Sequence, residues 1–283
     1  MYHHVSPAPG LVTLSPIAFR QQMEALARTG WRSAGLDDVA AFLRGEPLPV
    51  RTCVITFDDG YLDNFVHAHP VLQEFGLKAV LFIVTAWLGE GPVRSGSIDI
   101  PNHATCKARI AGGDADSVML RWSEVEAMQA AGTFEFHSHT HTHQRWDLTI
   151  ENEDARREAL LADLGASRIT LQQRLGTASR HLCWPQGYYD PLYQECAVGA
   201  GFDHLYTTEK KIVSRNSDPL SIGRIVTKER PGRWLLNRVA WFSIPWLGSA
   251  YALLNGLSGL KERPSAIASV GRRGQGRVLG GRS

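Results

Sequence analysis

The chain has 283 residues, a formal net charge of +2, and 43% hydrophobic residues. This length suits one large α/β domain, and the hydrophobic share excludes global disorder. Because the charge is nearly balanced, we expect no nucleic-acid partner. The four cysteines form no C-x-x-C pair, and the opening MYHHVSPAPG lacks the apolar region of a signal peptide. These features predict free thiols and a cytoplasmic protein.

Runs rich in β-branched and aromatic residues alternate with helical patterns along the chain. A first helix is predicted from Ser15, an N-cap followed by proline, to Gly30. Residues 89–117 interrupt the alternation and predict an insertion near the mouth of a barrel. Further helices are predicted over 151–175 and 191–201. Strands are predicted over 52–57, 79–85, 133–137, 181–184 and 204–208.

Alternation of strands and helices favours a parallel sheet with helices outside it. We therefore predict an α/β fold, a distorted (β/α) barrel of about seven parallel strands with its active site at the C-terminal strand ends. The barrel is expected over residues 1–230, and an apolar segment that is a packed helix or lies at a membrane interface over 231–260. A basic disordered tail is expected over 261–283, which has six Lys or Arg and one acid.

Residues 239–260 carry no charged side chain over 22 positions. That length is enough to span a bilayer, but Pro245 and Asn255 argue against a span. A buried helix pair and an interfacial segment remain as alternatives, and the tryptophans of this stretch favour the second. We therefore predict a peripheral membrane contact through 232–260, at the inner face of the membrane.

Two adjacent aspartates, Asp58 and Asp59, follow the first predicted strand in the stretch VITFDDGYLDNF. Neighbouring residues that leave a strand point in different directions, so one carboxylate can bind a metal while the other binds a water. The C-terminal end of a parallel strand is also where barrel active sites form. The alternative is a turn that caps the following helix, for which Asp-Asp-Gly is ordinary.

The stretch EFHSHTHTHQRW places a histidine at every second position from His137 to His143. In an extended strand all four rings would share one face. If the chain bends after His139, that residue and His143 form a pair four positions apart. One carboxylate and two imidazoles are a common first shell for Zn²⁺, and a second carboxylate can then act as general base.

Three motifs, TFDDG, SHTHTH and WPQGYYD, occur here in the order seen in the polysaccharide deacetylases, carbohydrate esterase family four with its NodB-homology domain. Together they are specific, whereas each alone would be weak. The chain resembles this family. The resemblance implies a hydrolase that depends on a divalent metal. The expected metal is zinc, with Co²⁺ or Ni²⁺ as alternatives. Its reaction would be removal of the N-acetyl group of a sugar, with release of acetate.

The resemblance also implies roles for individual residues. Asp59, His139 and His143 would be the metal ligands, and Asp58 would be the catalytic base. His141 would point elsewhere, and the first histidine of the run would serve packing or support the site from outside the ligand shell.

The third motif implies a substrate site in which two aromatic rings line the sugar and a backbone N–H near Gln186 stabilises the oxyanion. Many members of the family have an arginine before the proline of this motif, which orients the base. None is present here, so we expect Arg51 or a histidine to orient the base. The predicted substrate-binding residues are Trp184, Pro185, Gln186, Gly187 and Tyr188.

The Leu-x-His motif near the C-terminus, whose histidine is the family's general acid, is absent; LSIGRIVTK has Arg224 and no histidine. The opening MYHHV resembles the Tyr-His-x-Val of a subgroup, so His3 is predicted as the acid, with His4 on the opposite face of the strand.

The predicted substrate is a glycan or a lipid-linked glycan precursor. Two alternatives remain. One is a non-catalytic protein that binds carbohydrate or metal on a deacetylase scaffold, which the two departures from the family motifs favour. The other is a deformylase or another hydrolase of linear amides, which the same residues would serve.

Overall fold

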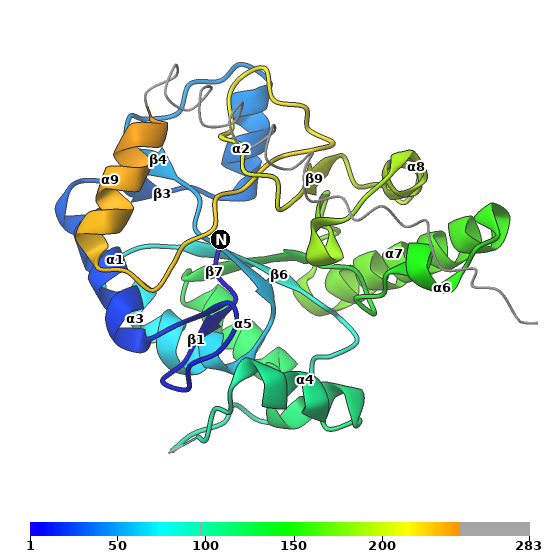
Figure 1. Ribbon diagram of the computed structural model, residues 1–283, viewed down its shortest axis with the longest axis horizontal. Coiled ribbons are helices and arrows are strands. Elements are labelled where there is room, and N and C mark those ends of the chain that lie inside the picture. The colour runs from blue at the N-terminus through cyan, green and yellow to red at the C-terminus, as the bar shows by residue number, and fades with distance from the viewer. Residues whose placement is uncertain (97, 244–283) are drawn as a thin grey trace, which may run out of the picture.

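A sheet of five parallel strands, in the order β5-β6-β7-β8-β9, forms the centre of the computed structural model (Figure 1). The structure describes residues 1–96 and 98–243. The predicted tail 261–283 and the apolar residues beyond 243 lie outside the described residues. Neighbours in the sheet are also neighbours in the chain, as expected when each strand returns through a helical crossover.

The strands and helices have the following bounds. The strands are β1 (His4–Val5), β2 (Thr13–Leu14), β3 (Arg32–Ser33), β4 (Thr52–Cys53), β5 (Thr56–Asp59), β6 (Ala79–Ile83), β7 (Phe134–Ser138), β8 (His181–Cys183) and β9 (His204–Tyr206). The helices are α1 (Pro16–Arg28), α2 (Leu36–Leu43), η1 (Asn64–Ala68), α3 (His69–Glu74), α4 (His103–Ala111), η2 (Ala115–Ser117), α5 (Trp122–Ala130), α6 (Trp146–Thr149), α7 (Glu153–Leu175), η3 (Pro185–Gly187), α8 (Pro191–Gly199) and α9 (Gly232–Phe242).

The predicted α/β fold with parallel strands is confirmed, but the number of strands is not. The sheet curls into a half-barrel in which five strands are assigned among the described residues, instead of about seven. Single parallel bridges continue the pairing at its edges, between Tyr2 and Phe57 and between Tyr206 and Ile222. The strand predicted over 52–57 is divided, because β4 pairs with β3 whereas β5 pairs with β6.

Helix α1 shows why the sequence encodes its own ends. The Ser15 side chain accepts a hydrogen bond from the Ala18 N–H, and Pro16 takes the first helical position. The chain leaves the helix at Gly30, whose φ of 75° lies in the left-handed region. The predicted first helix is therefore confirmed.

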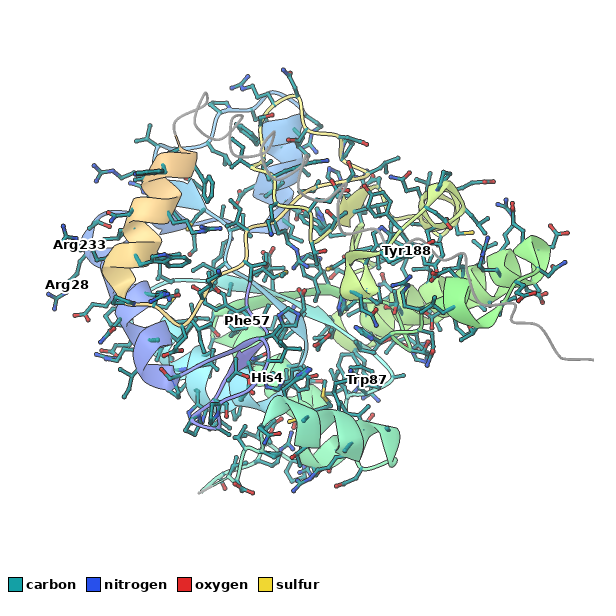
Figure 2. The ribbon with its side chains drawn as sticks, in the orientation of Figure 1. His4, Arg28, Phe57, Trp87, Tyr188 and Arg233 are labelled. Atoms are coloured by element: carbon teal, nitrogen blue, oxygen red, sulfur yellow. The ribbon has the colours of Figure 1, made fainter. Side chains whose placement is uncertain are left out.

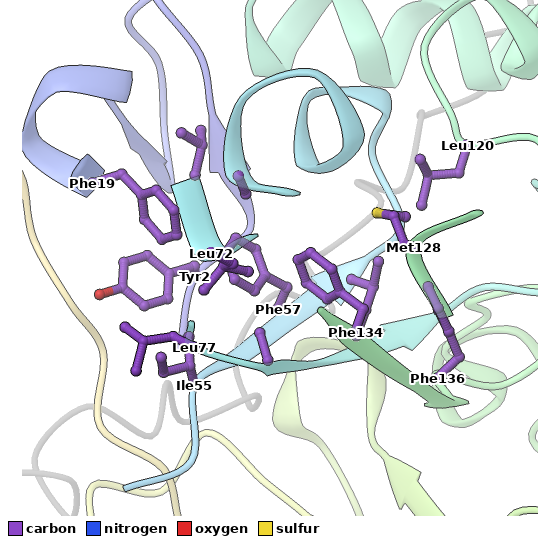
Figure 3. Packing of buried hydrophobic residues seen from close by; sticks show 14 of the residues in the cluster. Tyr2, Phe19, Ile55, Phe57, Leu72, Leu77, Leu120, Met128, Phe134 and Phe136 are labelled. Carbon is purple, nitrogen blue, oxygen red and sulfur yellow. The ribbon is translucent and has the colours of Figure 1, made fainter. Parts of the chain in front are cut away.

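The main core lies between the sheet and helices α1, α3 and α5 (Figure 3). Phe57 of β5 meets Phe134 of β7 with ring centroids 5.4 Å apart, and Phe19 of α1 lies 5.7 Å from Phe57. Because side chains alternate along a strand, burying Phe57 on this face directs Asp58 to the other one. The core thus sets the orientation of the first aspartate.

Helix α9 packs against α1, with Leu235 buried between them. At Gly232 a Cβ atom would lie 2.2 Å from the carbonyl oxygen of Gln21, so only glycine allows this close approach. The described part of the predicted segment 231–260 is thus a packed helix. Within residues 1–96 and 98–243, no helix has the combination of length and apolar character that crossing a bilayer requires.

Candidate active site

The two aspartates leave β5 in different directions, because the backbone reverses directly after them. Asp59 has a φ of 76°, unusual for a residue with a side chain, and Gly60 follows with 96°. Both carboxylates are buried. Asp58 faces Arg224, and Asp59 faces two histidines. Positive φ angles also occur at Thr140, His143 and Gln186. Such backbone strain is often found at functional sites.

Asp59, His139 and His143 form a compact group. The Oδ1 atom of Asp59 lies 3.3 Å from Nε2 of His139 and 3.5 Å from Nε2 of His143. Burial works to raise the pKa of the Asp59 carboxyl, but the two imidazoles outweigh it and hold that pKa below its usual range. Burial also lowers the pKa of His143 to about 4, so its ring is neutral at pH 7. The group therefore offers a metal at least one anionic ligand, Asp59, and one neutral ligand, His143.

The histidine run bends where β7 ends, so its rings do not share one strand face. Thr140 and His143 both have positive φ, at 67° and 61°. The hydroxyl of Thr140 accepts the His143 N–H, and the buried carboxylate of Asp163 on α7 accepts the N–H groups of His141 and Thr142. This bend brings His139 and His143, the first and last histidines of SHTHTH, together, with their ring centroids 5.1 Å apart.

The donor set fits a divalent metal. The three ligand atoms of Asp59, His139 and His143 all lie within 4.8 Å of one another. Nδ1–H of His139 donates to the carbonyl of Cys183, at 2.8 Å, which directs Nε2 toward Asp59. Burial works to lower the pKa of His139, but Cys183 and the two aspartates outweigh it and hold that pKa well above its usual value, so a bound metal would replace the proton on Nε2. Two imidazoles and a carboxylate leave positions open for water and substrate, as in catalytic zinc sites.

A second group, Asp58, His139 and Cys183, meets the same distance criterion. It is the poorer metal site because the guanidinium of Arg224 already contacts two of its members, at 2.6 Å from Asp58 Oδ1 and 2.9 Å from the Cys183 sulfur. A second cation there would be repelled by that charge. We therefore assign the possible metal site to the group around Asp59.

Arg224 is the residue that orients Asp58, a role the sequence assigned elsewhere. It donates from Nη1 to Oδ1 and from Nη2 to Oδ2, at 2.6 and 2.8 Å, and both side chains are buried. Burial favours a raised pKa for Asp58, but Arg224 outweighs it and lowers that pKa to about 2. The prediction for Arg51 is wrong, because its Nη1 donates to the carbonyl of Thr29, on the exposed side of β4. The one signal in the sequence was the lone arginine in the apolar LSIGRIV.

His3 lies beside Asp58. Its Nε2 is 3.7 Å from Oδ2 of Asp58. Burial lowers the pKa of His3, although the two nearby carboxylates oppose that shift. His4 points the other way, onto the buried carboxylate of Asp63, with its ring stacked on Tyr61 at 3.7 Å. The alternation predicted for the two histidines is therefore present.

The third motif forms the turn η3, and only part of it is accessible. Trp184 is 1% exposed and packs against Tyr193 in a second core cluster, so its ring has no open face for a sugar. Pro185 is buried as well. Gln186 is exposed and has a φ of 57°, and at Gly187 a Cβ atom would lie 2.1 Å from the Thr208 hydroxyl. The predicted stacking of Trp184 on substrate is thus not supported by its burial.

Two other aromatic rings are half-buried, Tyr188 directly after this turn and Trp87 in the loop after β6 (Figure 2). The guanidinium of Arg145 covers one face of Tyr188, at 3.8 Å from the ring centre. Trp87 lies 5.1 Å from the ring of His143. Trp87 was missed in the sequence because a single tryptophan in a loop has no motif around it.

The remaining histidines of the run do not face the possible metal site. His141 Nδ1 pairs with the Thr85 hydroxyl at 2.8 Å. His137 pairs with the Ser179 hydroxyl at 2.8 Å and lies 3.3 Å from Glu135. His141 thus points away from the group around Asp59, and the role of His137 as packing or support from outside the ligand shell stays a prediction.

The sequence model of the family described as "Polysaccharide deacetylase" matches residues 45–205, which is more than half of the chain. The chain belongs to the polysaccharide deacetylase family. That stretch includes Asp58, Asp59, His139 and His143, whereas His3 and Arg224 lie outside it.

Two solved structures are similar to this one. IcaB from Ammonifex degensii superposes with a TM-score of 0.64 at 22% identity, covering 86% of this chain and 94% of that one. The Streptococcus pyogenes deacetylase PplD, in complex with acetate, gives 0.67 at 21% identity, covering 84% and 95%. At these identities the likeness shows a shared fold.

Relatives are also found by sequence. YxkH of Bacillus subtilis (strain 168) is 34% identical over 90 residues, which is 31% of this chain and 32% of that protein. The poly-beta-1,6-N-acetyl-D-glucosamine N-deacetylase of Staphylococcus aureus (strain MSSA476) is 23% identical over 230 residues, 80% of this chain and 71% of that protein. The Escherichia coli (strain K12) protein of the same name is 35% identical over 72 residues, 25% of this chain and only 11% of that protein.

Proposed function

We propose that the chain is a metal-dependent deacetylase that hydrolyses N-acetyl groups of a polysaccharide and releases acetate. The observation that carries this proposal is the pairing of two sites: a carboxylate and two imidazoles within reach of one ion, and beside them a buried carboxylate held by a bidentate arginine. We take poly-beta-1,6-linked N-acetylglucosamine as the first substrate to test, because two relatives are named for that polymer.

In this proposal Asp59, His139 and His143 hold the metal. A divalent ion bound there polarises the acetyl carbonyl and lowers the pKa of water. Zn²⁺, Co²⁺ and Ni²⁺ all suit nitrogen and oxygen ligands of this kind. The N–H of Gln186 is proposed to donate a hydrogen bond to the acetyl oxygen as negative charge develops on it.

The proton path involves Asp58 and His3. Asp58 takes a proton from the attacking water, and Arg224 keeps the carboxylate ionised and fixed in orientation until then. A carboxyl group with a pKa of about 2 is a weak base and releases its proton readily. His3 has a lowered pKa and therefore begins neutral, with Nε2 3.7 Å from Asp58 Oδ2. We propose that His3 receives this proton and delivers it to the departing amine nitrogen.

The test is acetate release from a β-1,6-linked N-acetylglucosamine oligomer by the full chain, after chelation and after return of Zn²⁺. Activity is expected to vanish with chelator and to return with metal. Asp58→Asn is expected to lower kcat by roughly 10²–10⁴-fold. The matched control is Asp154→Asn, the same change in the exposed first turn of α7, which should leave kcat unchanged.

Three outcomes separate the proposal from its alternatives. Stoichiometric metal binding without acetate release from any glycan would favour the non-catalytic scaffold. Release of formate from a formylated substrate, with none of acetate, would favour a deformylase. Activity only on a lipid-linked glycan would identify the precursor form that the sequence predicted.

The role of His3 has its own test. A loss in His3→Ala that is confined to kcat would support its role as the acid.

A further inference from the structure

A partly open cavity of about 440 Å³ has Arg224 in its wall. Its walls come from β4, helices α2 and α9, and the segment 211–225. None of Asp58, Asp59, His3, His139 and His143 lines it. The volume falls within the range of small-molecule sites, which is about 300–1,000 Å³. The cavity is therefore large enough for a ligand and is separate from the proposed chemistry.

The described residues that line the cavity are mostly apolar side chains, together with basic side chains and no acidic ones. The apolar side chains include Val39, Phe42, Val54, Ile225, Leu235 and Val239. No aspartate or glutamate is among the described residues that line it, whereas Arg51, Lys211, Arg224 and Arg238 are. Asp58 neutralises Arg224, and Glu209 pairs with Lys211. An apolar ligand with one negative charge would match such a wall.

Arg51 stands where this cavity meets a second, open hollow. The hollow, of about 950 Å³, shares Trp31, Arg51 and Ser243 with the cavity. Nη1 of Arg51 donates to the Thr29 carbonyl, a neutral acceptor, so this contact does not neutralise its charge. Arg51 also has a φ of 58°, a strained backbone for arginine at a position with no role in the active site.

The entrance also exposes an apolar side chain. Val50, which lines the open hollow, is 88% exposed. Arg28 lines the same hollow, and Arg28 and Arg233 project from the α1–α9 side of the molecule (Figure 2). Exposed apolar side chains beside cations are typical of a surface that meets an amphiphile.

We propose that this cavity binds a single-chain anionic lipid of the fatty-acid type. The alkyl chain occupies the partly open cavity, where its burial is favourable because apolar surface leaves water. The carboxylate lies against the guanidinium of Arg51, which can hold it through two parallel hydrogen bonds. The head group stays in the open hollow, so no charge has to be buried without a partner.

The test is calorimetric titration of the full chain with dodecanoate below its micellar concentration. Dodecanoate is expected to bind with micromolar affinity, and dodecyltrimethylammonium, the same chain with a cationic head, at least about tenfold more weakly. Arg51→Glu should weaken dodecanoate by about tenfold or more, because the new carboxylate repels it. Arg44→Glu, the same change on an exposed arginine outside the cavity, should have no effect.

A second readout uses the unmodified chain. Cys53 lines the cavity and is half-buried, whereas the other three cysteines are buried and do not line it. Burial raises the pKa of the Cys53 thiol to about 11, so its alkylation is followed at alkaline pH. Dodecanoate should slow alkylation of Cys53 and leave the other cysteines unchanged.

Three results would overturn the proposal. The first is equal binding of the two amphiphiles, or unchanged affinity in Arg51→Glu. The second is unchanged affinity in a folded Val54→Trp chain, in which the new ring fills part of the cavity. The third is no binding by the full chain, which would mean that the cavity is filled by residues of the chain itself. Acetate release plays no part in these measurements, so they stand whether or not the chain is a deacetylase.

Discussion

On one face of the central sheet, Phe57, Phe134 and Phe136 are buried against helices and make only apolar contacts with one another and with α1, α3 and α5 (Figure 3). On the other face, the side chain next to Phe57 is Asp58, and paired polar groups lie there beside apolar side chains such as Phe82 and Tyr206. Asp58 has Arg224, and His137 has the hydroxyl of Ser179. One residue of shift along β5 therefore separates a core that stabilises the fold from the buried charges of the candidate active site.

The difference between the faces has a physical cause. Apolar packing has no required direction, so many side chains of suitable volume serve equally well. A buried charge, in contrast, is costly unless a partner meets it with correct geometry. The polar face is therefore the less tolerant one, and its partners come from segments far apart in the sequence. Asp58 and Arg224 are separated by 166 positions.

The strongest way to break the polar face is Arg224→Gln. It leaves the Asp58 carboxylate buried without its cation, and we expect a loss of roughly 3–5 kcal/mol in the free energy of unfolding at pH 7. A misplaced base is also expected to lower kcat by about 100-fold. Urea denaturation and acetate release measure the two effects.

The pH dependence distinguishes positioning from a merely structural role. In the native chain the pKa of Asp58 is about 2, below its usual 3.8, so the pair stabilises the fold above pH 3.8 and this contribution is lost as the pH falls through 2. In Arg224→Gln burial is opposed only by the weaker effects of His3 and His139, so the pKa of Asp58 rises from its native value and kcat should fall as pH is lowered through the new value. In Arg224→Lys the fall of kcat at low pH (the acid limb of the pH profile) should move back toward its native position. The value of kcat should not be fully restored, since lysine supplies the charge but not the two parallel hydrogen bonds of arginine. An unshifted acid limb in the glutamine variant would refute the assignment.

The apolar face is tested by Phe57→Ala. The substitution leaves a cavity among Tyr2, Phe19 and Phe134, and we expect a loss of about 3–5 kcal/mol in the free energy of unfolding. Metal affinity in the fraction that remains folded should be unchanged, because none of the three proposed ligands has a ring contact with Phe57. A large fall in metal affinity, measured by competition with a chromogenic chelator, would show that the two faces are coupled.

The smallest expected effect concerns the third motif. Tyr188→Ala removes a half-buried ring that Arg145 covers on one face, and KM for the glycan oligomer should rise by up to about tenfold. We expect kcat to stay within about twofold, since the sequence predicts that this residue binds substrate and does not contact the reacting bond. Tyr188→Phe keeps the ring and should behave like the native chain. If the phenylalanine variant is as impaired as the alanine variant, the hydroxyl carries the role.

Much of the fold was predictable because its signals are local. The cap at Ser15, the glycine at position 30 and the apolar runs of the five strands all act within a few residues, and their elements are confirmed. The number of strands was not predictable, because pairing is decided between distant segments. The division of 52–57 into β4 and β5 has the same origin, since each half follows a different neighbour.

The sequence alone determined the family and the residues that can form the possible metal site, because TFDDG and SHTHTH place the donors within short stretches. Only the tertiary structure decided that the histidine run bends, that Trp184 is in the core, and that Arg224 holds Asp58. The physical reason is range. A carboxylate and an imidazole can be recognised where they stand in a motif, but the cation that neutralises a buried charge can come from any strand, and only the folded chain shows which one reaches it.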